Sequence, residues 1–141
     1  IKFMFTCELL SGLWIGCSDT LNSKKFIQDN QITIILNCTQ LFDFPDLPIQ
    51  KIRLPFSSNP NSDTDLSLLR QNKQQIIEFI KGNIDDNNIL ICCYDGKSIS
   101  PFIVALYIAE YSKINRSSIY NILLTKDSSL SLWYDLSLFY S

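Results

Sequence analysis

The sequence predicts an α/β domain with a mainly parallel central sheet, on the basis of two short apolar runs and the helical pattern between them. Residues 32–38 and 89–93 are rich in β-branched side chains and almost continuously apolar, which is typical of strands covered by helices on both faces of a parallel sheet. Between them, apolar residues recur at steps of three and four, as on one face of an amphipathic helix. These residues are Leu66, Leu69, Ile76, Ile77 and Ile80. Strands that alternate with helices indicate the α/β class.

Capping residues predict where the helices begin and end. We expect the helix between the two strands to begin after Asp65, which can cap it, and to end at Gly82. Ser100 and Pro101 form a helix-start pair, because proline at the first helical position gives up only an N–H that has no partner. That helix should run to about Tyr111.

Two further helices are predicted near residues 117–124 and 130–140. In the last one, Leu132, Leu136 and Phe139 share one face. Such a stripe is either a docking surface or part of the core, and we favour core packing.

Composition limits the number of domains and the classes of partner. A chain of 141 residues, 46% of them hydrophobic, is long enough for one core and too short for two, so residues 1–141 should form a single domain. The 12 basic and 14 acidic residues are interspersed without blocks, which argues against a nucleic-acid partner. The longest apolar runs fall well short of the roughly 20 residues of a membrane-spanning helix, so no membrane association is expected. The chain opens with Ile1 and without a basic, apolar leader, and we expect a segment of a longer protein without a signal peptide.

Cysteine and histidine usage narrows the possible chemistry. Five cysteines occur at irregular spacings and form neither a disulfide framework nor a Cys-x-x-Cys metal site, which favours a reducing, intracellular and cytoplasmic location. The sequence has no histidine, which excludes Ser–His and Cys–His nucleophile pairs and zinc sites that depend on imidazole. We expect no metal and no cofactor.

The segment that carries the chemistry runs from Cys93 to Ser100 and reads Cys-Tyr-Asp-Gly-Lys-Ser-Ile-Ser. It joins a buried strand to a helix, and in open parallel sheets ligands bind beyond the carboxyl ends of the strands. A short loop at a helix N-terminus, with Gly96 to allow the turn, can direct several N–H groups at an anion. Cys93 is then either a nucleophile, driven towards the thiolate by those groups, or a small buried hydrophobic residue.

Four further segments accompany this loop in a characteristic order. Residues 9–16 read Leu-Leu-Ser-Gly-Leu-Trp-Ile-Gly, residues 35–39 read Ile-Leu-Asn-Cys-Thr, and residues 52–55 read Ile-Arg-Leu-Pro. The last predicted helix carries Leu132, Asp135, Leu136 and Phe139. Together with the loop, these segments resemble the dual-specificity branch of the protein tyrosine phosphatases over nearly the whole chain. The resemblance implies that family's fold, a central, mainly parallel five-stranded sheet flanked by helices.

The loop departs from this family at the residues that carry out its reaction. In the family, a cysteine attacks phosphorus, a loop arginine binds the phosphoryl oxygens and an aspartate from another loop protonates the leaving oxygen. The resemblance places Cys93, Gly96 and Ser100 at the nucleophile, glycine and serine positions, but Ile99 at the arginine and Cys92 at the histidine before the nucleophile. An arginine–phosphoryl contact is typically worth a few kcal/mol in the transition state. We therefore expect no catalysis from this loop.

The sequence also offers no clear general acid and no full replacement for the arginine. The family's aspartate falls at about Ser58; Asp63 or Asp65 can take its place only by moving, and Asp65 is better explained as a helix cap. We expect neither to be catalytic. Lys97 can replace the arginine only in part, because lysine lacks the planar fork. Arg116, the only arginine downstream, lies beyond the next predicted helix.

The sequence thus predicts a catalytically inactive dual-specificity-phosphatase-like domain. Such a pseudophosphatase would act as a protein-binding, scaffolding or structural component with protein partners, within a larger assembly. One alternative is a weakly active Cys-dependent phosphatase acting on phosphotyrosine, phosphoserine or phosphothreonine. Another is a reader of phosphorylated residues, which should keep the arginine and dispense with the cysteine. The degenerate loop comprises Cys93, Gly96, Lys97, Ser98, Ile99 and Ser100.

Overall fold

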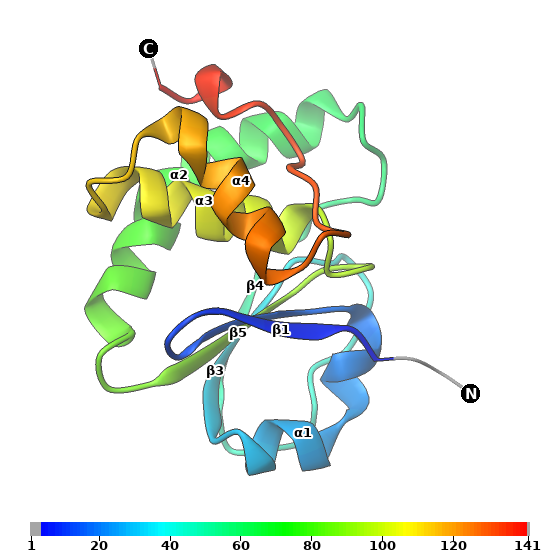
Figure 1. The fold of residues 1–141 in the computed structure, drawn as a ribbon. Helices are drawn as coiled ribbons and strands as arrows, with labels where there is room; N and C mark the ends of the chain where they lie inside the picture. Colours follow the sequence, from blue (N-terminus) through cyan, green and yellow to red (C-terminus); the bar gives the residue numbers. More distant parts are fainter. Residues whose placement is uncertain (1–3, 141) are drawn as a thin grey trace.

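The computed structural model describes residues 4–140, which fold around a five-stranded sheet (Figure 1). The strands are β1 (Thr6–Leu10), β2 (Leu13–Gly16), β3 (Ile32–Asn37), β4 (Gln50–Arg53) and β5 (Asn88–Cys92). Their order in the sheet is β1-β2-β5-β3-β4. β1 and β2 are antiparallel, and all other neighbours are parallel. The predicted fold class is confirmed.

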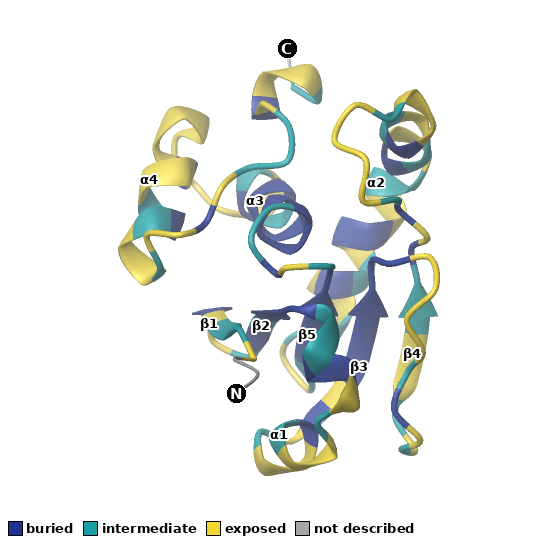
Figure 2. Ribbon diagram, turned by 90° about the vertical axis from the view of Figure 1, so that its right-hand side faces the viewer, coloured by how far each residue is buried: buried dark blue, intermediate teal, exposed yellow. Residues whose placement is uncertain are grey.

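Helices cover both faces of the sheet. They are α1 (Lys24–Asp29), α2 (Asp63–Asn83), α3 (Ile99–Tyr111) and α4 (Arg116–Lys126), with short 3-10 helices at Ser18–Asn22 and Leu136–Leu138. Helices α2, α3 and α4 lie on one face and α1 on the other (Figures 1 and 2). Within residues 4–140, no helix is long and apolar enough to cross a membrane.

β5 lies at the centre of the sheet, and its side chains alternate between two apolar clusters. Ile89 and Ile91, with Cys93 just beyond the strand, belong to the larger cluster beneath α2 and α3. Leu90 and Cys92 belong to the smaller cluster on the side of α1. All five side chains are fully buried, and Figure 2 shows β5 mostly in the buried colour. The loop at its carboxyl end therefore has a rigid starting point.

The start of α2 differs from the prediction, because Asp65 is not its cap. The helix begins at Asp63, and the hydroxyl of Ser62 caps it by accepting a hydrogen bond from the amide of Asp65 (3.1 Å). Asp65 is buried in the first turn, where its two carboxylate oxygens accept hydrogen bonds from the amide (3.0 Å) and the hydroxyl (2.6 Å) of Ser57. Its carboxylate thus fastens the segment after β4 to the helix.

Other helix ends lie within two residues of their predicted positions. α2 continues past Gly82 to Asn83. α3 begins at Ile99, so that Pro101 is its third residue rather than its first. Proline is still tolerated there, because the first four amides of a helix have no partner within it. The helix predicted near residues 117–124 is confirmed as α4.

The helix predicted over residues 130–140 is wrong. This segment is irregular apart from its short 3-10 helix. The amide of Ser131 donates a hydrogen bond to the carbonyl of Lys97 (2.8 Å), which ties the segment to the loop after β5. The carboxylate of Asp135 accepts from the amide of Ser137 (2.9 Å), and local hydrogen bonds of this kind compete with helix formation.

The apolar residues of this C-terminal segment nevertheless serve the core. Leu136 is buried in the larger cluster, and Leu132 and Phe139 pack against it. Core packing, the favoured interpretation of this stripe, is confirmed although the residues do not share a helix.

Candidate functional site

The loop between β5 and α3 wraps around the sulfur of Cys93. This side chain is fully buried, and the amides of Gly96 and Ser100 donate to its Sγ at 3.2 and 3.4 Å. The thiol also lies 3.9 Å from Oδ1 of Asp95, which accepts from it. The structure thus brings together the cysteine, the glycine and the serine that the resemblance assigned to the loop.

Gly96 is required by the path of the loop. Its φ of 77° lies in the left-handed region that favours glycine. A Cβ at this position would also lie 2.8 Å from the carbonyl carbon of Gly16 and 2.9 Å from the amide nitrogen of Cys17. Both constraints come from the backbone alone, so they persist whether or not the loop performs chemistry.

Burial raises the pKa of the Cys93 thiol, and the charge of Asp95 acts in the same direction. Hydrogen bonds from Ser100 and from the amide of Gly96 lower this pKa without offsetting the burial. We attribute the lowering mainly to the two amides, because the buried Ser100 hydroxyl meets no partner with good hydrogen-bond geometry within residues 4–140. A thiol with a raised pKa stays protonated near neutral pH and is a poor nucleophile.

A cleft of about 250 Å³ opens above the loop. Its walls come from the loop, from the segment after β4 and from the C-terminal segment. The lining residues are Ser57, Ser58, Pro60, Tyr94, Asp95, Ser98, Ile99 and Trp133. Asp95 is the only charged residue among them. Ser58, the position where the resemblance places the family's aspartate, lies at the cleft but carries no acid.

Ile99 occupies the position that the resemblance assigns to the arginine. Its side chain is 5% exposed, packs in the larger core cluster and lines the cleft. An aliphatic group at this point offers neither a hydrogen-bond donor nor a positive charge to an anion in the cleft.

Lys97 is turned away from the cleft. Its Nζ lies 5.3 Å from the centre of the Phe5 ring, and Lys97 is not among the residues that line the cleft. Its backbone carbonyl is engaged too, since it accepts from both the amide and the hydroxyl of Ser131. In this conformation Lys97 does not replace the arginine.

The two aspartates considered as general acids also lie outside the cleft lining. Asp65 is buried with both oxygens bonded to Ser57. Asp63 is exposed on the first turn of α2 and lines a separate hollow with Leu66 and Arg70. Neither carboxyl group faces the space above Cys93.

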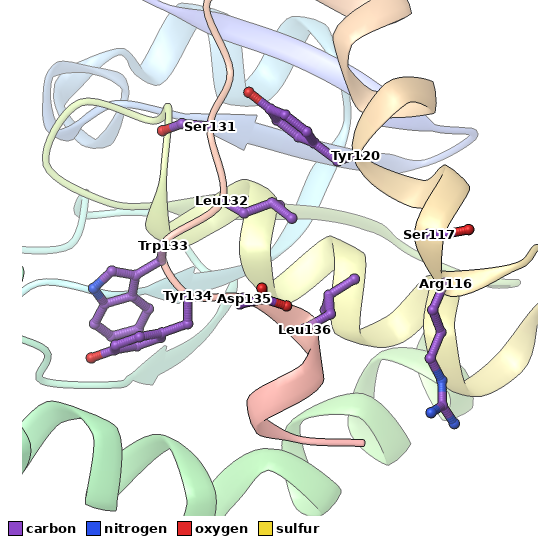
Figure 3. A pocket seen from close by; sticks show the side chains of 9 residues that line it. All are labelled: Arg116, Ser117, Tyr120, Ser131, Leu132, Trp133, Tyr134, Asp135 and Leu136. Carbon is purple, nitrogen blue, oxygen red and sulfur yellow. The ribbon is translucent and has the colours of Figure 1, made fainter. Parts of the chain in front are cut away.

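A larger hollow of about 510 Å³ lies between α4 and the C-terminal segment (Figure 3). Arg116 is on its rim, and Figure 3 shows the guanidinium pointing away from Trp133, the residue this hollow shares with the cleft. The guanidinium stacks over the ring of Tyr140, 4.2 Å from its centre. The expectation that Arg116 does not serve the loop agrees with this placement.

Two aromatic walls of the cleft were not anticipated from the sequence. The Tyr94 hydroxyl donates to the carbonyl of Phe56 (2.7 Å) and accepts from the amide of Gln40 (3.2 Å). Trp133 packs its ring edge-to-face on Phe56, with centroids 4.9 Å apart. No pattern in the sequence pointed to Trp133, because its segment is predicted to form a helix.

Within residues 4–140, no three side chains of the metal-ligating types come together to form a candidate metal site.

Comparisons with known proteins bear on the fold. No protein-family model and no curated protein matches the sequence. Among solved structures, a variant of human DUSP28 is 13% identical and matches with a TM-score of 0.81, over 95% of this chain and 92% of that chain. A human tyrosine phosphatase-like serine/threonine/tyrosine-interacting protein is 19% identical, with a TM-score of 0.76 over 90% of this chain and 87% of its own.

A third structure comes from Entamoeba histolytica, a leucine-rich repeat and phosphatase domain containing protein. It is 17% identical, with a TM-score of 0.76 over 95% of this chain and 89% of that chain. The chain has the dual-specificity-phosphatase fold. A fold of this kind can host different functions, so the function of this dual-specificity-phosphatase-like domain has to be argued from its own cleft.

Proposed function

We propose that this chain is a degenerate member of the dual-specificity phosphatase family, a pseudophosphatase that acts as a protein-binding, scaffolding or structural component of a larger assembly. The observation that carries the proposal is Ile99, a buried aliphatic side chain at the arginine position. Removing one such charge-assisted donor from a phosphoryl-transfer site typically costs on the order of a hundred- to a thousand-fold in rate.

The surroundings of Ile99 support the same conclusion. Within the described part of the chain, residues 4–140, the cleft lining includes no basic side chain, and Lys97 packs over Phe5 instead. Asp95 adds a negative charge next to the position that a phosphoryl group would occupy. A cleft with this lining disfavours a dianion, which argues against a phosphatase and against a reader of phosphorylated residues alike.

One observation favours the alternative, a weakly active Cys-dependent phosphatase. The amides of Gly96 and Ser100 still converge on the Cys93 sulfur, as required of a loop that supports a thiolate. The two functions differ in whether turnover depends on Cys93.

Steady-state hydrolysis of p-nitrophenyl phosphate and of a phosphotyrosine peptide separates the two functions. The wild-type domain and the Cys93→Ser variant should show the same background, because Cys93 stays protonated and no cation stabilises the transition state. The exchange preserves the loop, since a serine hydroxyl can accept the same amide hydrogen bonds. Turnover by the wild type that is clearly higher and is lost in Cys93→Ser would establish the weak phosphatase.

A further inference from the structure

The cleft above the loop is acidic, whereas a phosphate site has to be basic. Asp95 is its one charged lining residue. Ser57 lines the cleft and donates hydrogen bonds to the buried carboxylate of Asp65, which lies behind it. Among residues 4–140, no basic side chain lines the cleft, so a cation in it meets complementary charge.

The positive end of α3 only partly compensates these carboxylates. A helix N-terminus carries roughly half a unit charge, and the loop amides of Gly96 and Ser100 are directed at the Cys93 sulfur. The amide of Lys97 donates to Oδ1 of Asp95 (2.9 Å). These three N–H groups already have acceptors within the loop, and Asp95, whose Oδ1 accepts from Lys97, is exposed at the cleft.

The nearby cations are held elsewhere by contacts of their own. Arg53 donates to the carbonyls of Thr39 (2.9 Å) and Phe42 (2.8 Å) and stacks over Phe44. Lys97 lies over Phe5. Neither Arg53 nor Lys97 lines the cleft, so neither side chain neutralises the negative charge of Asp95.

The walls of the cleft suit the flat, apolar faces of a guanidinium group and its stem. Phe56 holds both aromatic residues in place. Its carbonyl accepts a hydrogen bond from the Tyr94 hydroxyl, and its ring packs against the ring of Trp133. Arginine stacks on aromatic faces and binds carboxylates through its planar fork. The volume of about 250 Å³ is below the roughly 300–1,000 Å³ of small-molecule sites and suits one long side chain.

An apolar rim extends the cleft towards the loop between β3 and β4. Leu41 is 88% exposed and Phe42 is 44% exposed, and the Phe42 ring contacts the Tyr94 ring edge-to-face, with centroids 6.1 Å apart. The Phe42 carbonyl is held by the side chains of Asn37 and Arg53, so this exposed pair sits on an ordered backbone. Exposed apolar residues that gather beside a cleft are a feature of interaction surfaces.

We propose that the cleft binds an arginine side chain of a protein partner, with a neighbouring apolar residue of that partner packed on Leu41 and Phe42. The arginine would stack against Tyr94 and Trp133 and pair with Asp95. This inference rests on the proposed function, because a working phosphatase loop has to attract an anion to the same place.

The test is a titration of the isotopically labelled domain with N-acetyl-leucyl-arginine amide, followed by NMR. The matched probe is the citrulline analogue, which keeps the shape and removes the charge. We expect the arginine probe to shift the amide signals of Tyr94, Asp95 and Ser98 and the indole signal of Trp133, with a Kd on the order of 1 mM. The citrulline probe should bind at least about fivefold more weakly, since it lacks the charge that pairs with Asp95.

Asp95→Asn should weaken the arginine probe about fivefold or more, because it removes the paired charge but keeps an oxygen for the Lys97 amide. Asp86→Asn is the matched control, an equal change of charge at an exposed residue before the other end of β5, and should leave the affinity unchanged. Equal binding of the two probes, an unaffected Asp95→Asn variant, or no shift at the cleft overturns the inference. These results do not contradict the proposed function, provided that the domain shows no phosphatase turnover. Turnover that depends on Cys93 contradicts the proposed function, whichever probe binds.

Discussion

The loop between β5 and α3 has an inner side, which packs around Cys93, and an outer side, which lines the cleft. The two sides differ in which residues of the phosphatase-type loop are present. On the inner side, Gly96 retains its left-handed backbone against Gly16, and two amides still converge on Cys93. On the outer side, the cleft lining has an isoleucine at the position of the arginine, and Asp95 is the one charged residue that residues 4–140 contribute to it. The residues that fold the loop are thus present, whereas the arginine that would bind phosphate is replaced by Ile99.

The largest effect is predicted for the inner side, with Gly96→Ala. The new Cβ would meet the backbone of Gly16 and Cys17 at 2.8 and 2.9 Å, at a φ of 77°, and should lower the free energy of unfolding by about 2–4 kcal/mol. Urea denaturation measures this. Gly82→Ala is the control, because a Cβ there meets nothing within 4 Å and alanine favours a helix by up to about 1 kcal/mol. Equal stability of the two variants would show that the loop is not held as described.

A smaller loss is predicted for Asp65→Ala. The exchange leaves the amide and hydroxyl of Ser57 without their buried acceptor, at a cost of about 1–3 kcal/mol in the free energy of unfolding. Asp63→Ala changes the same charge on an exposed position of the same helical turn and should cost about 0.5 kcal/mol or less. A neutral Asp65→Ala variant would mean that this carboxylate does not fasten the segment after β4, and would reopen a role for it in the cleft.

A smaller effect than these two losses of stability is predicted on the outer side, with Ile99→Arg. Restoring a guanidinium should strengthen tungstate binding about tenfold from a level no tighter than about millimolar, because a charge-assisted contact adds roughly 1.5–3 kcal/mol and Asp95 opposes part of it. Thermal shift against tungstate concentration reports the affinity. Ile99→Gln controls for polarity without charge and should not bind more tightly than the wild type. Micromolar tungstate binding by the wild type would contradict the account and favour a phosphate reader.

Much of this architecture could be predicted from the sequence, because its signals are local. The continuous apolar run at residues 89–93 predicted a buried central strand, and the loop that follows was located from that strand, Gly96 and the next helix. The sequence predicts Asp65 as the helix cap, whereas Ser62, three residues earlier, caps α2. The carboxylate of Asp65 is bonded to Ser57 instead, and this contact is visible only in the structure.

The cleft could be predicted less well, because its walls come from distant parts of the chain. Trp133 reaches it through an irregular segment held by a hydrogen bond from Ser131 to Lys97, a long-range contact without a periodic signal. The direction of Lys97 likewise depends on the position of Phe5, which precedes β1 and is distant from Lys97 in the sequence. Sequence identified the missing arginine, but the charge of the finished cleft required the structure.

The most direct test of the central claim is the pH dependence of Cys93 alkylation, since a working loop would hold a thiolate near neutral pH. The rate is measured with iodoacetamide, and Cys93 is resolved from the other four cysteines by peptide mass spectrometry. Burial raises the pKa of Cys93, so the protonated form persists as pH increases past the ordinary thiol value of about 8.5. We predict slow modification at neutral pH, with a half-maximal rate above about pH 8.5, the midpoint expected of an ordinary thiol. Rapid modification of Cys93 with a midpoint below about pH 7 would show that the loop still builds a thiolate, and would contradict the account.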